Sequence, residues 1–93
     1  MITVKKIASL INGKLYGKDD ILIKGAFDLV PGKKSFVSFL DSNSNIDLLS
    51  KSKSDLIITS NKIDPEEITK TVIMVDDPKS SFFEIVKKYF YLK

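Results

Sequence analysis

A chain of 93 residues with a net charge of +3 is long enough for one domain with a modest hydrophobic core. It contains no cysteine and no histidine, which excludes disulfides, thiolate metal sites and the commonest general base of enzymes. All 15 basic residues are lysines and 12 acidic residues oppose them, so recognition of phosphate or guanine by planar arginine side chains is excluded too.

The first predicted element is a helix over residues 4–11. Thr3 precedes apolar residues at helical spacing, and Asn12-Gly13 supplies a left-handed stop. The stretch "KLYGKDDILIKG" then has apolar residues on either side of a Gly/Asp turn, which predicts two short strands joined by that turn.

A strand, a loop and a helix follow. "SFVSFL" is rich in residues that favour strands. A polar run comes next, and "NIDLLSKS" spaces its apolar residues as expected of a short helix over residues 45–51.

The second half predicts buried strands with a crossover between them. "DLIIT" and "TVIMV" are continuous apolar runs, typical of strands buried on both faces of a mixed or parallel sheet. Asp64-Pro65 signals the start of a short crossover helix, and Asp77-Pro78 repeats this signal before a helix over residues 79–91. The pattern predicts a small single α/β domain, with a short mixed sheet of about five strands and about three helices.

Two pairs of carboxylates, Asp19-Asp20 and Asp76-Asp77, occupy turn or cap positions, where aspartate accepts hydrogen bonds from backbone amides. Neither pair has a third oxygen ligand beside it in the sequence. We therefore expect no metal site, no catalytic group and no cofactor in this chain.

Phe36 and Phe39 stand just before the polar run. Because their spacing is odd, a strand sends the two rings to opposite faces, so that one can enter the core while the other faces the loop. An aromatic ring beside a polar loop suits a nucleobase, since stacking contributes about 1–3 kcal/mol and small polar groups can bond the base edge. Packing of both rings in the core is the alternative.

Three segments in order span nearly the whole chain: "TVKKIASLINGKLYGKDDILIKGAFDL", "SFLDSNSNIDLLSKSKSDLIIT" and "VIMVDDPKSSFFEIVKKYF". This order resembles the N-terminal, non-repeat domain of the UDP-3-O-acylglucosamine N-acyltransferase family. More distantly it resembles the N-terminal domain of the UDP-muramoyl peptide ligases, whose Asp-Ser-Arg segment is missing here.

The resemblance implies a domain that recognises the uridine part of a UDP-sugar in lipid A biosynthesis. In that family a second domain of hexapeptide repeats takes the acyl group from acyl carrier protein and supplies the histidine base. Residues 1–93 contain neither the repeats nor a histidine, so we expect no activity from them alone. The implied partners are UDP-acylglucosamine, the repeat domain and acyl carrier protein. The absence of cysteine favours a reducing compartment, so the expected location is the cytoplasm.

Three site residues follow from aligning "SFLDSNSN" with the family's "SFL.N..Y". Phe39 takes the position of the uracil-stacking ring, Ser42 replaces the base-reading asparagine, and Asn45 replaces the second stacking aromatic. Making Phe36 the stacking ring instead requires a gap, so we expect Phe36 in the core. With one stacking wall absent, uridine affinity should be about millimolar, or about 4 kcal/mol.

Two other functions stay open. The departures at Ser42 and Asn45 favour a structural or protein-interaction domain that has lost nucleotide binding. A weak nucleic-acid binder is the other, although nucleic acid is not the expected partner, and its candidate contacts around Phe39 are Lys33, Lys34, Lys51 and Lys53.

Four consecutive apolar residues, Tyr89 to Leu92, stand at the end of the last predicted helix. No single helical face can cover them all, which predicts a contact surface for a partner. No apolar run approaches the roughly 20 residues of a membrane span, and the N-terminus lacks a signal-peptide pattern, so we expect a soluble, unprocessed protein.

Overall fold

The structure is a computed structural model in which residues 1–41 and 45–90 are described. Its main sheet has five strands in the order β2-β7-β6-β5-β4. Neighbours from β4 to β7 run parallel, and β2 joins β7 antiparallel. This arrangement confirms the predicted α/β class with a short mixed sheet. The strands are β2 (Lys14–Tyr16), β4 (Gly25–Ala26), β5 (Phe36–Phe39), β6 (Leu56–Ser60) and β7 (Val72–Val75).

A second sheet of two strands pairs β1 (Ile2–Thr3) with β3 (Leu22–Ile23) antiparallel. The two strands predicted around the Gly/Asp turn therefore form, but they join different sheets, because β2 lies beside β7 and β3 beside β1. Their partners come from distant parts of the chain.

The helical elements follow the start signals read from the sequence. α1 has the predicted bounds, with Thr3 as its N-cap and Asn12 in the left-handed region at φ 53° as its end. The predicted crossover helix is only a 3₁₀ turn, η1, and the last predicted helix changes to π-helical geometry in η2. The elements are α1 (Val4–Ile11), α2 (Leu48–Lys51), η1 (Pro65–Glu67), α3 (Pro78–Ile85) and η2 (Val86–Phe90).

α2 begins three residues later than the predicted helix over residues 45–51. Asn45 Oδ1 accepts a hydrogen bond from the Asp47 N–H at 2.9 Å. Such a side-chain bond closes a turn and competes with helical geometry, which accounts for the late start.

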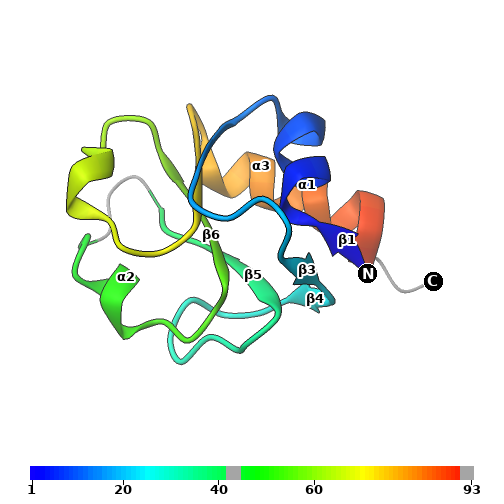
Figure 1. Ribbon diagram of the computed structural model, residues 1–93, viewed down its shortest axis with the longest axis horizontal. Helices are drawn as coiled ribbons and strands as arrows, with labels where there is room; N and C mark the ends of the chain where they lie inside the picture. The colour runs from blue at the N-terminus through cyan, green and yellow to red at the C-terminus, as the bar shows by residue number, and fades with distance from the viewer. Residues whose placement is uncertain (42–44, 91–93) are drawn as a thin grey trace.

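Apolar side chains cover both faces of the main sheet, as its continuous apolar strands require. α1 and α3 lie together on one face, and α2 lies on the other (Figure 1). The larger cluster, under α1 and α3, contains Val4, Ile7, Ile23, Val37, Leu56, Ile58, Ile73, Val75, Phe82 and Ile85. The smaller cluster contains Leu40, Leu49, Ile57, Val72 and Met74.

The expectation that Phe36 lies in the core is wrong. Its ring is half-buried and belongs to neither cluster, whereas Val37 next to it is fully buried. Phe36 pairs with Gly25 of β4, and a Cβ on that glycine would come within 2.7 Å of the Phe36 ring. The ring therefore lies over the glycine at the edge of the sheet, because the missing side chain leaves room there.

At the other end of the chain, Tyr89 and Phe90 are half-buried and pack against the larger cluster. Tyr91 and Leu92 lie outside the described residues, so the contact surface predicted here stays a prediction. Among the described helices, none combines the length and apolarity needed to cross a membrane.

Candidate functional site

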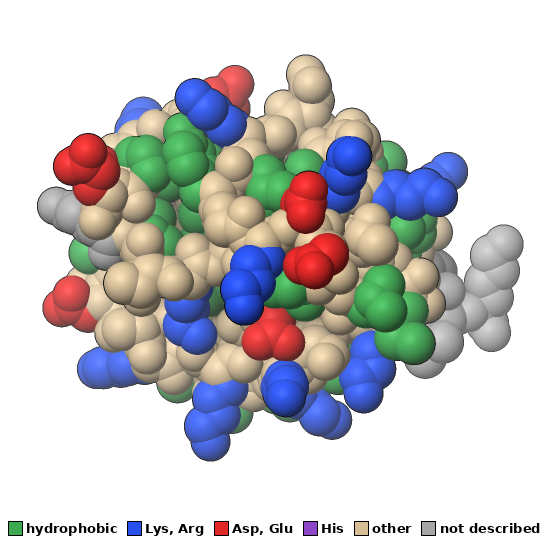
Figure 2. All heavy atoms as spheres, viewed as in Figure 1, with side chains coloured by type: hydrophobic (Ala, Val, Ile, Leu, Met, Phe, Trp, Pro, Cys, Tyr) green, Lys and Arg blue, Asp and Glu red, His purple; other side chains and the backbone are tan. Residues whose placement is uncertain are grey.

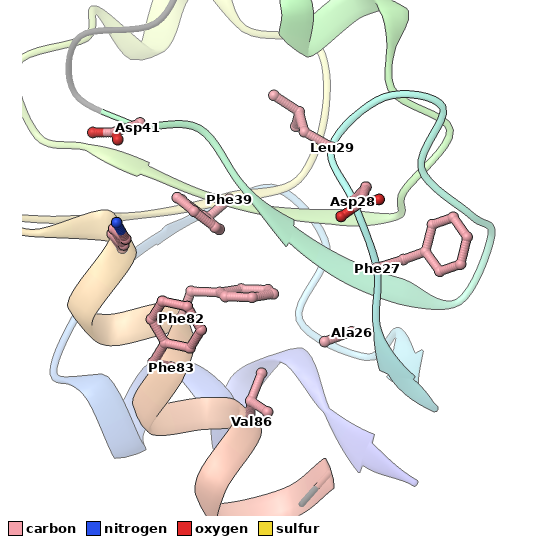
Figure 3. Close-up of a pocket in the computed structure, with 10 residues that line it drawn as sticks. Ala26, Phe27, Asp28, Leu29, Phe39, Asp41, Phe82, Phe83 and Val86 are labelled. Carbon is pink, nitrogen blue, oxygen red and sulfur yellow. The ribbon is translucent and has the colours of Figure 1, made fainter.

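A groove of about 620 Å³ lies beyond the carboxyl ends of β4 and β5, where they face α3 (Figure 3). Open α/β sheets commonly bind ligands at the carboxyl ends of parallel strands. The groove is lined by Ala26, Phe27, Asp28, Leu29, Phe39, Asp41, Lys79, Phe82, Phe83 and Val86.

Three phenylalanine rings form one wall of this groove. The centroid of the Phe39 ring lies 4.8 Å from that of Phe82 and 6.5 Å from that of Phe83. These separations are in the range where aromatic rings attract each other. Phe82 is only 8% exposed and belongs to the core, whereas Phe83 is 51% exposed and Phe39 is half-buried. The cluster is therefore anchored in the core and still presents ring surface to the groove.

α3 contributes three of the lining side chains, from its first turn onward, and η2, which continues it, contributes a fourth. They are three or four residues apart, so the helical repeat brings them to one side: Lys79, Phe82, Phe83 and Val86. The helix is held at its start by Asp77, whose side chain accepts a hydrogen bond from the Ser80 N–H at 3.1 Å. One cap thus sets where this wall begins.

The opposite wall is the loop after β4, which a chain of hydrogen bonds ties to β5. Ser38 Oγ donates to the carbonyl oxygens of Phe27 at 2.8 Å and Asp28 at 3.2 Å. It also lies 2.6 Å from Ser54 Oγ, which accepts from the Lys33 N–H at 3.2 Å. Since Ser38 has one proton and gives it to the carbonyls, the proton between the two hydroxyls belongs to Ser54.

Three charged side chains, Asp28, Asp41 and Lys79, line the groove with the rings. Figure 3 shows Asp41 beyond Phe39 at the end of β5, and Asp28 on the loop opposite α3. Carboxylates accept hydrogen bonds and an ammonium group donates them. The groove can therefore hold a planar ring by stacking, with polar groups of the ligand bonded around it.

The structure places the three predicted site residues differently. Phe39 lines the groove. Ser42 lies outside the described residues. Asn45 is exposed, bonds to the Asp47 N–H at the turn before α2, and does not belong to the described groove lining. In the structure Phe39 therefore has aromatic neighbours on α3, which the alignment did not predict.

The sequence analysis did not predict Lys79, Phe82 and Phe83 as site residues, because the aligned segment that indicated the site covers only residues 38–45. Two signals point to them. A helix that follows a buried parallel strand begins at the carboxyl edge of the sheet, where ligands bind. The first helical turns then carry residues three and four apart toward that edge.

The lysines considered for nucleic-acid binding are not among the described lining residues of this groove. Lys33 stands over the rings of Phe36 at 5.0 Å and Phe27 at 6.0 Å, and neither it nor its three companions belongs to the described lining. Figure 2 shows lysine side chains spread over one face among carboxylates, not gathered in a single patch. A nucleic-acid site around Phe39 has no support from this distribution.

No protein-family model matches the chain. The chain is 30% identical over 87 residues to a UDP-3-O-acylglucosamine N-acyltransferase of Methylacidiphilum infernorum (isolate V4). The match covers 94% of this chain and 24% of that protein, so the chain spans about a quarter of its relative's length. The resemblance read from the sequence is confirmed, and it concerns an N-terminal part of such an enzyme.

Proposed function

Since the chain is related to part of a UDP-3-O-acylglucosamine N-acyltransferase, we propose that residues 1–93 form the uridine-recognising domain of such an enzyme. In this proposal the groove beside Phe39 receives the uracil of UDP-acylglucosamine, and acyl transfer takes place on a hexapeptide-repeat domain. That domain and, through it, acyl carrier protein are the protein partners. The process is lipid A biosynthesis in the cytoplasm.

The observation that carries this proposal is the position of Phe39, half-buried on the wall of a groove of about 620 Å³. Ligand pockets commonly measure about 300–1,000 Å³, so a nucleotide base and part of its sugar find room there. Stacking on an aromatic ring contributes about 1–3 kcal/mol per base. The packing of Phe39 on Phe82 holds the ring in place before a ligand arrives, which lowers the entropic cost of binding.

Titration of UMP into the isotope-labelled protein, followed by amide chemical shifts, tests this function. The shifts should concentrate on the groove residues, with a dissociation constant of about 1 mM. Phe39→Leu keeps an apolar side chain against Phe82 but removes the stacking ring, and it should weaken binding by about 1–3 kcal/mol. Tyr16→Leu also replaces an aromatic ring, on β2 at the other edge of the sheet and outside the described groove lining, and is the matched control, with unchanged binding expected. An equal loss in both variants, or shifts that avoid the groove, contradicts the proposal.

A structural or protein-interaction domain is the second candidate, and the exposure of Phe83 favours it. A phenylalanine that is 51% exposed beside two other rings can serve as an anchor for another protein surface. UMP should then cause no shifts, while a domain partner should lose affinity with Phe83→Ala. The UMP titration therefore separates the two candidates.

A further inference from the structure

The groove is polar at one end and apolar at the other. Lys79 and Asp41 lie where α3 begins and β5 has just ended, whereas Ala26 and Val86 form the opposite end. The ring of Phe39 lies between these ends, facing α3 (Figure 3). A ligand with an anionic part therefore meets different surroundings at the two ends.

We infer that Lys79 binds the diphosphate of the nucleotide, an inference that rests on the proposed uridine function. The base must stack on the rings, so its phosphates can leave toward either end of the groove. The apolar end offers Ala26 and Val86, which cannot compensate a desolvated anion. Lys79 is the cation among the described lining residues, and an ammonium group binds phosphate by charge-assisted hydrogen bonds.

The spacing along α3 agrees with this orientation. Lys79 precedes Phe82 and Phe83 by three and four residues, which is a rise of about 4.5–6 Å along the helix. A lysine side chain has a flexible stem of four carbons, so its ammonium group can move further along the groove. The phosphates of a nucleotide stacked at the rings thus come within its reach.

Asp41 lies at the same end, just after β5, and its charge opposes the binding of an anion. Its carboxylate should weaken diphosphate binding by repulsion, and Asp28 on the loop opposite should add a smaller effect of the same sign. The two charges at the polar end, Lys79 and Asp41, therefore act in opposite directions on the same ligand group.

The experiment compares uridine with UDP in wild type and three variants by the same amide-shift titration. Wild type should bind UDP about tenfold more tightly than uridine, because one charge-assisted hydrogen bond contributes a gain in affinity of about that size. Lys79→Gln should remove most of this advantage, so that the variant binds UDP and uridine with similar affinity. Lys87→Gln, an exposed lysine of η2 outside the groove lining, makes the same change in net charge and should keep the advantage. Asp41→Asn should increase the affinity for UDP more than the affinity for uridine.

The outcomes separate the inference from the function on which it rests. If uridine shifts the groove residues but UDP binds no more tightly than uridine, the inference is wrong and the proposed function stands. The same holds if Lys79→Gln and Lys87→Gln lose equal amounts of UDP affinity. A wild type that binds neither uridine nor UDP overturns both. Increasing salt should reduce the UDP advantage in wild type, because it screens the attraction between Lys79 and the phosphates, and it should leave the binding of uncharged uridine unchanged.

Discussion

Phe36 and Phe39 have different surroundings although they are three residues apart on one strand. Phe36 lies over Gly25 at the sheet edge, with its ring 5.9 Å from that of Phe27. Phe39 lies on the other face, against Phe82 of α3. The alternation of side chains along a strand separates the two rings, and the neighbours across each face decide what each ring does. Only Phe39 therefore combines packing on the core with access to the groove.

Introducing the residues of the aligned acyltransferase pattern at positions 42 and 45 should strengthen nucleotide binding. Ser42→Asn and Asn45→Tyr together should tighten UMP binding by about 1–3 kcal/mol, chiefly through a second stacking face. The amide can also donate and accept at the base edge, whereas a serine has one hydroxyl, so discrimination of uracil from cytosine should improve. Titrations of UMP and CMP measure both effects.

The control for this pair is Ser42→Asn with Asn45→Ala, which removes the same asparagine without adding a ring. Both pairs lose the hydrogen bond from the Asp47 N–H to Asn45 Oδ1, so the change at the turn before α2 is matched. If the tyrosine gives no gain over the alanine, the second stacking position lies elsewhere.

Among the elements, the loop after β4 depends most on side-chain hydrogen bonds. Its carbonyl groups bond to Ser38, which is fully buried on β5, and Ser38 bonds to Ser54 before β6. Bonds in such a chain polarise and strengthen one another in a buried setting. The wall of the groove opposite α3 is therefore set by two serines that are 16 residues apart.

Ser38→Ala should lower the free energy of unfolding by about 1–3 kcal/mol, because it leaves buried carbonyls and the Ser54 hydroxyl without their partner. Amide hydrogen exchange should also accelerate in the loop after β4, which then lacks its tie to β5. Urea unfolding and hydrogen exchange measure the two effects. Ser9→Ala, exposed on α1, is the control and should change little. Equal stability of both variants would show that the serine chain is not needed to hold the loop.

At the scale of the whole molecule, β6 is the central strand of the main sheet, and both faces of the core meet on it. Leu56 and Ile58 point to the larger cluster and Ile57 to the smaller. Thr59 is also fully buried, yet its hydroxyl has no hydrogen-bond partner among the described residues. A buried hydroxyl without a partner destabilises the folded state, because it bonds to water in the unfolded chain.

Thr59→Val should therefore raise the free energy of unfolding by about 1–2 kcal/mol, since valine keeps the shape and removes the hydroxyl. Thr71→Val is the matched control, because Thr71 Oγ1 accepts a hydrogen bond from the Lys18 N–H at 3.1 Å and its loss should destabilise. Urea unfolding of both variants gives the comparison. A destabilised Thr59→Val variant would mean that this hydroxyl has a partner in the folded protein.

The sequence by itself determined the elements whose signals lie in neighbouring residues. The continuous apolar runs predicted β6 and β7 as strands buried on both faces of a mixed or parallel sheet, and the caps at Thr3 and Asp77 predicted where α1 and α3 begin. These signals are readable because burial on both faces requires apolar residues throughout, and because a cap bonds to amides only a few residues away. The resemblance to the acyltransferase was readable for the same reason, since it rests on the order of such segments.

Only the tertiary structure decided which residues share the groove. Phe39 shares the groove with Lys79 and Phe82, which stand 40 and 43 residues later in the sequence, and no local sequence pattern predicts that they lie together. The separation of β2 and β3 into different sheets and the edge position of Phe36 have the same origin. Each depends on which distant segment packs opposite, and that choice minimises exposed apolar surface and unpaired backbone groups over the whole molecule at once.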